Sequence, residues 1–260
     1  MTVIISIHSF RGGTGKSNIT ANIASQLAMD GKRVAVFDTD IYSPGIHVPF
    51  GLDENSMGRT LNEYLRSECS IEEVAFSIGE HPGSDPGRLK LAGKTLWLVP
   101  ASINGDEISR VLRDGYSVSR LNEGIQSLRK QLALDYMMID THPGLSEETL
   151  LSLAISDVII LVLRPDAQDF QGTAVTIDVA RNLDVPRMVM VINKALLNRY
   201  KADQIRNEVE STYGEQVIGV LPLSEDMADL RSADIFSLCY PDHAWSKVIQ
   251  EMAQALTAEG

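Results

Sequence analysis

The chain has 260 residues, of which 44% are hydrophobic, so it fits one large α/β domain or two small ones and can build a full core. Its formal net charge of −12 excludes a surface that is basic throughout, although a local basic patch for nucleic acid stays open. The sequence has no stretch of about 18 unbroken apolar residues, which excludes a transmembrane helix. It also has no CxxC pair, which leaves metal and redox sites without support.

The first residues, MTVIISIH, include neither a basic region nor a small-residue cleavage site, so we expect a first strand in a cytoplasmic protein and no signal peptide. Similar short apolar runs recur along the chain, with amphipathic stretches between them. Most runs are nearly continuous in Val, Ile, Leu and Met, which is typical of strands buried on both faces of a parallel sheet. The predicted strands are Val3–Ile7, Val34–Phe37, Leu96–Val99, Tyr136–Ile139, Val158–Leu163, Met188–Ile192 and Val217–Leu221.

Helical spacing marks the segments between these strands. Strand and helix therefore alternate, which predicts an α/β fold with a single doubly wound, mostly parallel sheet flanked by helices. Residues 79–93 are rich in Gly and Pro and predict a surface excursion. We expect one domain over residues 1–260. The helical stripes are Ile19, Ile23 and Leu27, followed by Gly31 as a stop, and Leu121, Ile125, Leu128 and Leu132.

The segment FRGGTGKS, residues 10–17, directly follows the first predicted strand and opens the first predicted helix, which is the context of a phosphate-binding loop. Its glycines let backbone N–H groups approach phosphate oxygens, and the helix adds its positive N-terminal end. We expect Lys16 to place a charge on the β- and γ-phosphates and Ser17 to offer a hydroxyl to Mg²⁺. The expected nucleotide-binding residues of this segment are Gly12, Gly13, Thr14, Gly15, Lys16, Ser17 and Asn18.

Two further predicted strands end in aspartates. The second strand runs into Asp38 and Asp40, and the strand before residues 141–144 ends in Asp140. Carboxylates at the carboxyl ends of parallel strands lie where such sheets bind ligands. An apolar strand that ends in aspartate fits the Walker B pattern, in which the carboxylate holds Mg²⁺ through water. His142 leaves two interpretations open, a general base or a residue that makes loop hydrogen bonds.

These motifs, in this order and spacing, resemble those of the MinD/ParA group of partitioning ATPases, which are P-loop NTPases of the SIMIBI class. The strict pattern GxxxxGK[ST] is not met, because Phe10 stands where it needs glycine. The deviant form xKGGxGK[ST] fits instead, with Arg11 in place of its first lysine. In that group the lysine reaches across a dimer interface to the partner's nucleotide. Arg11 keeps the charge and gains a planar fork of donors. Two interpretations stay open: Arg11 takes the same role, or the role lies with another residue.

The resemblance spans nearly the whole chain and implies further roles. Asp38 is expected near the metal ion, and Asp40 is expected to orient the attacking water. Asn193 and Lys194, and Pro222 after the last predicted strand, are expected to cradle the adenine of ATP. The resemblance thus implies ATP and Mg²⁺ as cofactors. The expected catalytic residues are Arg11, Lys16 and Asp40, and the expected metal-site residues are Ser17, Asp38 and Asp140.

Branches of the group differ in features that this sequence tests. Iron-protein relatives and iron–sulfur scaffolds need cysteine motifs, and bacterial tyrosine kinases end in a cluster of tyrosines. This sequence has neither feature. MinD-type proteins end in a basic amphipathic helix on the membrane. Residues 241–260 carry an apolar stripe but one Lys against three acids, Glu259 among them, a net of −2. Anionic lipid repels such a face, so we expect this helix to dock on the core.

A basic cluster between Pro186 and Arg206 favours nucleic acid as the matrix, which is the cellular surface that the ATP-bound dimer would bind. It holds five Lys or Arg and one Asp, a net of +4 within an acidic chain. Doubled in a dimer, it would grip DNA phosphates without reading sequence, while a solvated charged loop is the alternative. The five cations are Arg187, Lys194, Arg199, Lys201 and Arg206.

We therefore expect an ATP hydrolase that dimerises on ATP and positions or partitions a cargo such as a carboxysome, a plasmid or a chromosome. The ATP-bound homodimer would bind a matrix, expected to be nucleoid DNA, and an adaptor protein would stimulate hydrolysis. The first lysine of the form xKGGxGK[ST] is called the signature lysine. Carboxysome-positioning relatives of the McdA type lack it, which favours a carboxysome as the cargo. The alternatives are a MinD-like membrane-associated ATPase, a metabolic ATP-dependent synthetase of the same superfamily, and an interaction module with negligible hydrolysis.

Overall fold

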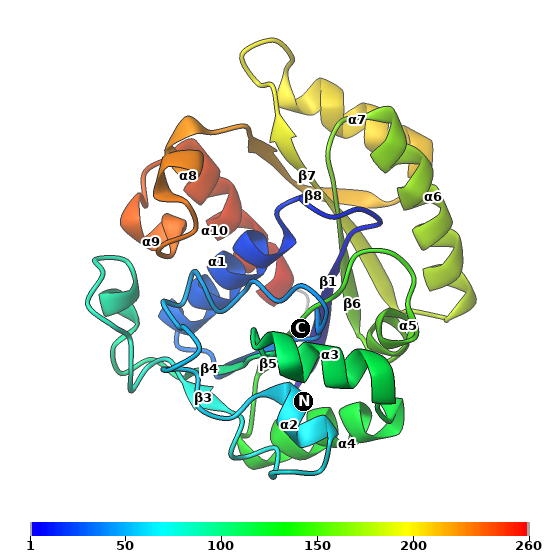
Figure 1. Cartoon of the computed structure of the whole chain (residues 1–260). Helices are drawn as coiled ribbons and strands as arrows, with labels where there is room; N and C mark the ends of the chain where they lie inside the picture. The colour runs from blue at the N-terminus through cyan, green and yellow to red at the C-terminus, as the bar shows by residue number, and fades with distance from the viewer. Residues whose placement is uncertain (1, 259–260) are drawn as a thin grey trace.

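The computed structural model describes residues 2–258, whose strands form one eight-stranded sheet in the order β3-β4-β2-β5-β1-β6-β7-β8 (Figure 1). Neighbouring strands are parallel except β3 and β4. The predicted α/β class with a mostly parallel sheet is confirmed, and all seven predicted runs are strands. The strands are β1 (Val3–His8), β2 (Val34–Asp38), β3 (Phe76–Ser77), β4 (Leu96–Val99), β5 (Tyr136–Asp140), β6 (Val158–Leu163), β7 (Arg187–Ala195) and β8 (Gln216–Pro222).

Helices cover both faces of this sheet, as Figure 1 shows. Along β6, alternate side chains enter different cores: Val158, Ile160 and Val162 pack with α1 and α10, whereas the residues between them pack with α6 and α7. Burial on both faces explains why the strand sequences are continuously apolar. The helices are α1 (Lys16–Met29), α2 (Leu61–Leu65), η1 (Arg88–Leu91), α3 (Gly105–Asp114), α4 (Val118–Gln131), α5 (Glu147–Ala154), α6 (Ala167–Asn182), α7 (Ala202–Tyr213), α8 (Glu225–Leu230), α9 (Phe236–Cys239) and α10 (Ala244–Thr257).

The strand order brings the predicted motifs to one edge of the sheet. β1 lies between β5 and β6, and β2 lies on the other side of β5. Asp140 at the end of β5 is in register with Asp38 on β2 and with Ile7 on β1. The loop after β1 and the two aspartate segments therefore meet at the carboxyl edge, where open parallel sheets bind ligands.

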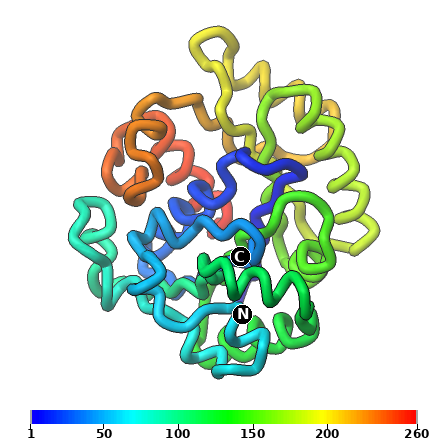
Figure 2. The backbone as a smooth tube through the Cα atoms, in the orientation of Figure 1, coloured from blue at the N-terminus to red at the C-terminus, as the bar shows by residue number. Residues whose placement is uncertain are grey.

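The Gly- and Pro-rich excursion of residues 79–93 contains only the short η1 helix and is anchored to the C-terminal part of the chain. The backbone N–H groups of Gly87 and Arg88 each donate to the carboxylate of Asp234 over 2.8 Å. Asp234 is buried and directly precedes Ile235, the N-cap residue of α9. Figure 2 shows the excursion running beside this segment. A buried carboxylate thus fixes a segment whose composition predicts only a loop.

The C-terminal helix α10 docks on the core, as predicted. Trp245, Ile249, Met252 and Leu256 are buried in the same core as α1. Glu259 and Gly260, which entered the predicted charge of this segment, lie outside the described residues. Within residues 2–258, no helix is long and apolar enough to cross a membrane.

Candidate functional site

The glycine-rich loop between β1 and α1 adopts the geometry of an anion cradle. Gly13 and Gly15 have positive φ angles of 75° and 96°, which glycine adopts without strain, and Gly15 is the N-cap of α1 with no side-chain cap. The first N–H groups of the helix are therefore free to bind a ligand. A cavity of about 230 Å³ opens here. Its lining residues are Gly12, Gly13, Gly15, Lys16, Ser17, Asn18, Asp40, Ser43 and Pro143.

Lys16 holds its charge almost out of water at the floor of this cavity. Its residue surface is 7% exposed, and Nζ donates to the Ser9 hydroxyl over 3.1 Å. Burial lowers the pKa of Lys16, and the nearby carboxylates, Asp140 first, oppose that shift. A buried ammonium with one neutral hydrogen-bond partner favours an anionic ligand.

Residues at the end of β7 fasten the loop from behind. The Asn193 side-chain amide donates to the carbonyl oxygen of Thr14 over 2.7 Å, and Lys194 Nζ donates to that of Gly13 over 2.8 Å. A side chain at Gly15 would collide with the Asn193 amide. Asn193 was expected to bind adenine. Its amide donates to the loop in this structure, and the residue also lines the more apolar cavity described below, so adenine binding stays a prediction.

Two buried aspartates beside the loop, Asp38 and Asp140, lie in an environment that disfavours their charge. Asp140 accepts the Ser17 hydroxyl over 2.6 Å. Burial raises the pKa of Asp140 to about 6, although Lys16 and the Ser17 hydrogen bond oppose the shift. Burial, followed by the charges of Asp140 and Asp40, raises the pKa of Asp38 well above its ordinary value. A cation bound beside these carboxylates would stabilise their charged forms.

The residues present fit Mg²⁺ bound together with phosphate. Asp38 Oδ2 is buried and has no hydrogen-bond partner within residues 2–258, and the Ser17 hydroxyl lies against Asp140. Mg²⁺ typically uses one or two carboxylates, waters and phosphate oxygens. In the described part of the chain, no group of three His, Cys, Asp or Glu side chains is arranged to hold a metal by itself. Waters and nucleotide oxygens would therefore complete the coordination.

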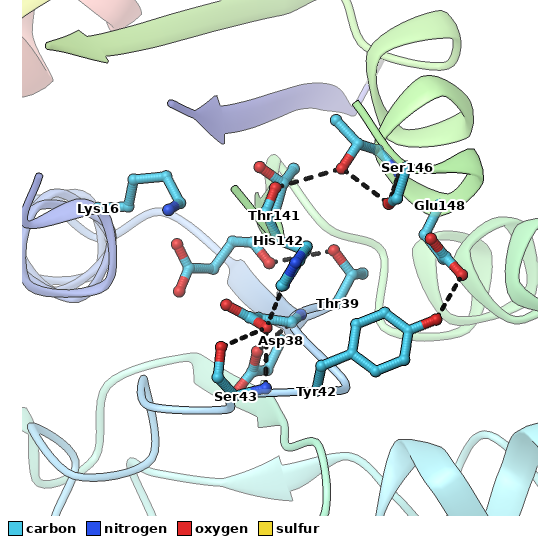
Figure 3. Close-up of polar contacts among 12 residues, drawn as sticks. Lys16, Asp38, Thr39, Tyr42, Ser43, Thr141, His142, Ser146 and Glu148 are labelled. Carbon is cyan, nitrogen blue, oxygen red and sulfur yellow. Dashed lines mark hydrogen bonds and ion pairs between the residues drawn. The ribbon is translucent and has the colours of Figure 1, made fainter. Parts of the chain in front are cut away.

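Asp40 lines the cavity of about 230 Å³ at the glycine-rich loop, which we call the phosphate cavity. Residues of two loops hold its carboxylate. Its Oδ1 accepts the backbone N–H and the hydroxyl of Ser43, each over 3.0 Å. The same oxygen lies 2.7 Å from His142 Nδ1, on the loop after β5 (Figure 3). The sequence prediction of a carboxylate near the phosphates is thus supported by geometry, and the histidine is its direct neighbour.

A second, more apolar cavity of about 290 Å³ adjoins the phosphate cavity, because Gly15 and Asn18 line both. Pro222 and Lys194, both expected around the base, lie in its wall. Met227 and Trp245 are wall residues that the sequence prediction missed, since only the fold brings α8 and α10 to the loop. The lining residues are Gly15, Asn18, Asn193, Lys194, Pro222, Leu223, Ser224, Met227, Ala228 and Trp245. A polar cavity at the glycine-rich loop beside a more apolar one suits a nucleotide, whose phosphates and base differ in the same way.

Arg11 points away from the phosphate cavity of its own chain. Its Nη1 lies 3.6 Å from Asp169 Oδ1 and 3.8 Å from Asp166 Oδ1, at the N-terminus of α6, and its side chain is 40% exposed. Arg11 lines an open hollow with Phe10 and with one face of α6. The Asp169 carboxylate is buried, but Arg164 already donates to both of its oxygens, over 3.0 and 3.2 Å. The longer contacts of the half-exposed Arg11 therefore leave its guanidinium free to exchange partners.

The five cations predicted as one basic patch do not lie together, and that prediction is wrong. Arg187 begins β7, whereas Arg199 and Lys201 follow its other end, and nine strand residues span about 26 Å. Lys194 binds the phosphate loop, and Arg206 donates to the carbonyl oxygen of a β8 residue. Only the exposed pair Arg199 and Lys201, in the loop before α7, stays a candidate.

His8, at the end of β1, is a buried residue that sequence reasoning missed. Its Nδ1 lies 2.8 Å from the Thr141 hydroxyl, which itself donates to the carbonyl oxygen of Ile7. Nδ1 must therefore donate, and Nε2 has no partner among the described residues. Burial, then the charges of Lys16 and His142, lower the pKa of His8 to about 3. A neutral His8 thus anchors the start of the loop after β5.

Comparisons with known proteins agree with this geometry. A model of the CobQ/CobB/MinD/ParA nucleotide binding domain matches residues 5–235. An uncharacterised ATP-binding protein of Methanocaldococcus jannaschii is 26% identical over 260 residues, which cover 98% of this chain and 88% of that protein. The fold resembles MinD of Pyrococcus horikoshii complexed with Mg-ADP, with a TM-score of 0.80, 20% identity, and 99% and 96% of the two chains covered. It also resembles McdA of Cyanothece, with a TM-score of 0.75, 16% identity, and 98% and 100% covered.

Proposed function

Because the chain belongs to the CobQ/CobB/MinD/ParA nucleotide-binding family, we propose that it is an Mg²⁺-dependent ATPase that dimerises on ATP and positions an intracellular cargo. One observation carries the nucleotide part: buried Lys16 lies in a phosphate-sized cavity that adjoins an apolar base-sized cavity, with Asp40 on its wall. A loop, a cation and a carboxylate in this order suit phosphoryl transfer to water.

The residues divide the work of hydrolysis among them. The free N–H groups at the start of α1 and Lys16 bind the phosphates and take up charge that develops on them. Ser17, Asp38 and Asp140 would hold Mg²⁺, which would supply neutralising charge when bound. Asp40 accepts a hydrogen bond from the attacking water and so orients it toward the γ-phosphate.

The position of Arg11 supports a dimer. Its guanidinium stays outside its own cavity, on a face where Phe10 and Val175 are exposed. Exposed apolar side chains around an arginine are typical of contact surfaces. In a dimer closed over two ATP molecules, Arg11 would bind the partner's phosphates in a site largely free of water, where such a contact is strong.

The proposed matrix rests on one pair of basic residues, and the proposed cargo rests on Arg11. Arg199 and Lys201 form an exposed basic pair that a dimer doubles, which suits phosphates of nucleoid DNA. The apolar stripe of α10 is buried, so it offers no face to a membrane. An adaptor that stimulates hydrolysis would release the dimer from DNA. Among cargoes, a carboxysome is favoured over a plasmid or chromosome, because Arg11 replaces the signature lysine.

Mixing two inactive variants tests the shared site. Arg11→Ala and Asp40→Ala should each hydrolyse ATP slowly. In a mixed dimer, one site combines the intact Asp40 of one protomer with the intact Arg11 of the other, so activity should return. Activity no higher than that of either variant alone, with heterodimers confirmed by native mass spectrometry, would show that Arg11 does not act across the interface.

A further inference from the structure

The carboxylate of Asp40 is hydrogen-bonded in an unequal way. Oδ1 receives two donors from Ser43, each at 3.0 Å, and lies 2.7 Å from His142 Nδ1. No such partner reaches Oδ2 from within residues 2–258. An ionised carboxylate only accepts hydrogen bonds, so Nδ1 of His142 must donate. One oxygen is thus saturated and the other is left open.

The open oxygen belongs to a residue of the phosphate cavity, and the histidine stands behind it. Asp40 and Ser43 are lining residues of that cavity, together with Pro143, whereas His142 is not. The order from the cavity outward is therefore carboxylate first and imidazole second. His142 would therefore act on a water bound in this cavity through Asp40.

His142 is itself held in place by neighbours other than Asp40. The ring of Tyr42 meets the imidazole edge-on, with 5.3 Å between centroids and 80° between planes. The Tyr42 hydroxyl lies 3.3 Å from Oε1 of Glu148 on α5, and the Thr149 hydroxyl donates to the carbonyl oxygen of His142. Figure 3 shows the side chains of Tyr42 and Ser43, on the loop after β2, close to that of His142, on the loop after β5.

We propose that His142 is a positioning residue for ATP hydrolysis: it donates to Oδ1 of Asp40 and so turns Oδ2 toward the water that attacks the γ-phosphate. The inference rests on the proposed ATPase function. Asp40 and His142 come from loops that follow different strands and lie 102 residues apart. The orientation of the water therefore requires both loops in place at once, which ties hydrolysis to their arrangement. Misplacing a reacting group by about 1 Å costs on the order of 100-fold in rate.

The competing arrangement reverses the roles: Asp40 would orient His142, and Nε2 would take the proton from water. Substitution separates the two. Asparagine places its amide nitrogen where Nδ1 stands, so it donates to Asp40 but has no basic nitrogen. Glutamine carries its amide one bond farther from the backbone and does not match that place. His81, which is exposed on the excursion, provides a matched control.

The test measures kcat and KM for Mg-ATP together with the affinity for a fluorescent ATP analogue. We expect His142→Ala to lower kcat by at least about tenfold with KM and affinity nearly unchanged. His142→Asn should recover kcat to within about threefold of wild type, His142→Gln should stay low, and His81→Ala should match wild type. Unchanged affinity shows that the variants are folded.

Two results would overturn the inference while the proposed function stands. A His142→Ala variant with wild-type kcat would remove any role for the histidine. A His142→Asn variant as slow as His142→Ala would transfer the role to Nε2 as a base. Failure of the proposed function is distinct, because wild type would then hydrolyse ATP no faster than Lys16→Ala, and the inference would fall with it.

Discussion

Replacing Lys16 by alanine should remove most of the nucleotide affinity of the protein. Lys16 is 7% exposed and has one hydrogen bond, to Ser9, so its ammonium is available to phosphate oxygens at little desolvation cost. Each charge-assisted hydrogen bond contributes about 1.5–3 kcal/mol, and contacts to the β- and γ-phosphates make two of them. A loss of about 3–6 kcal/mol raises Kd by roughly 10²- to 10⁴-fold.

The assay is a titration with a fluorescent ATP analogue in the presence of Mg²⁺. Lys130, exposed on α4, is a matched control, and Lys130→Ala should bind like wild type. Circular dichroism should show that Lys16→Ala keeps its fold, because the side chain bridges no core residues. A change in Kd of less than about threefold would refute the assignment of the phosphate loop.

Two further predictions concern the metal site and the matrix. The raised pKa of Asp38 means that the folded state holds this proton more tightly than the unfolded chain, so its contribution to stability is present below about pH 4 and is lost as pH rises toward the raised pKa. Asp38→Asn should therefore raise the melting temperature of the nucleotide-free protein at about pH 8, by roughly 2–4 °C for each kcal/mol of stability gained, and leave it unchanged near pH 4. An equal rise at both pH values would show that the raised pKa of Asp38 is not the reason for the gain. Arg199→Glu with Lys201→Glu should abolish ATP-dependent, salt-sensitive DNA binding in fluorescence anisotropy without changing basal ATPase, whereas Lys247→Glu should not. ATP-dependent binding of wild type to anionic liposomes and not to DNA would favour the membrane alternative.

The fold could be predicted because the strands are buried on both faces. Runs such as Val158–Leu163 leave no polar position, so their type and bounds are readable from the sequence. β3 could not be found this way: it has two half-buried residues, Phe76 and Ser77, and exists only through its pairing with β4. The phosphate loop was predictable because its glycines and Lys16 are adjacent in the chain.

The rest of the site depends on distances that sequence order does not give. The cations between Pro186 and Arg206 are close together in the sequence, but β7 separates Arg187 from Arg199 and Lys201 by its whole length. Asn193 was expected at adenine, and the sequence does not show that its amide donates to the carbonyl oxygen of Thr14. The contact between Asp40 and His142 joins two loops through side-chain conformations, which no local pattern specifies.

The most direct measurement of the central claim is the mass of Asp40→Ala in solution with ATP and with ADP. This variant keeps the phosphate contacts and loses the water-orienting carboxylate, so bound ATP persists. Multi-angle light scattering should report twice the 28.5 kDa of one chain with Mg-ATP and the monomer mass with Mg-ADP. Adding Arg11→Ala to the same chain should shift the ATP sample back toward monomer. A monomer mass with both nucleotides, while the ATP analogue binds normally, would contradict a nucleotide-switched dimer.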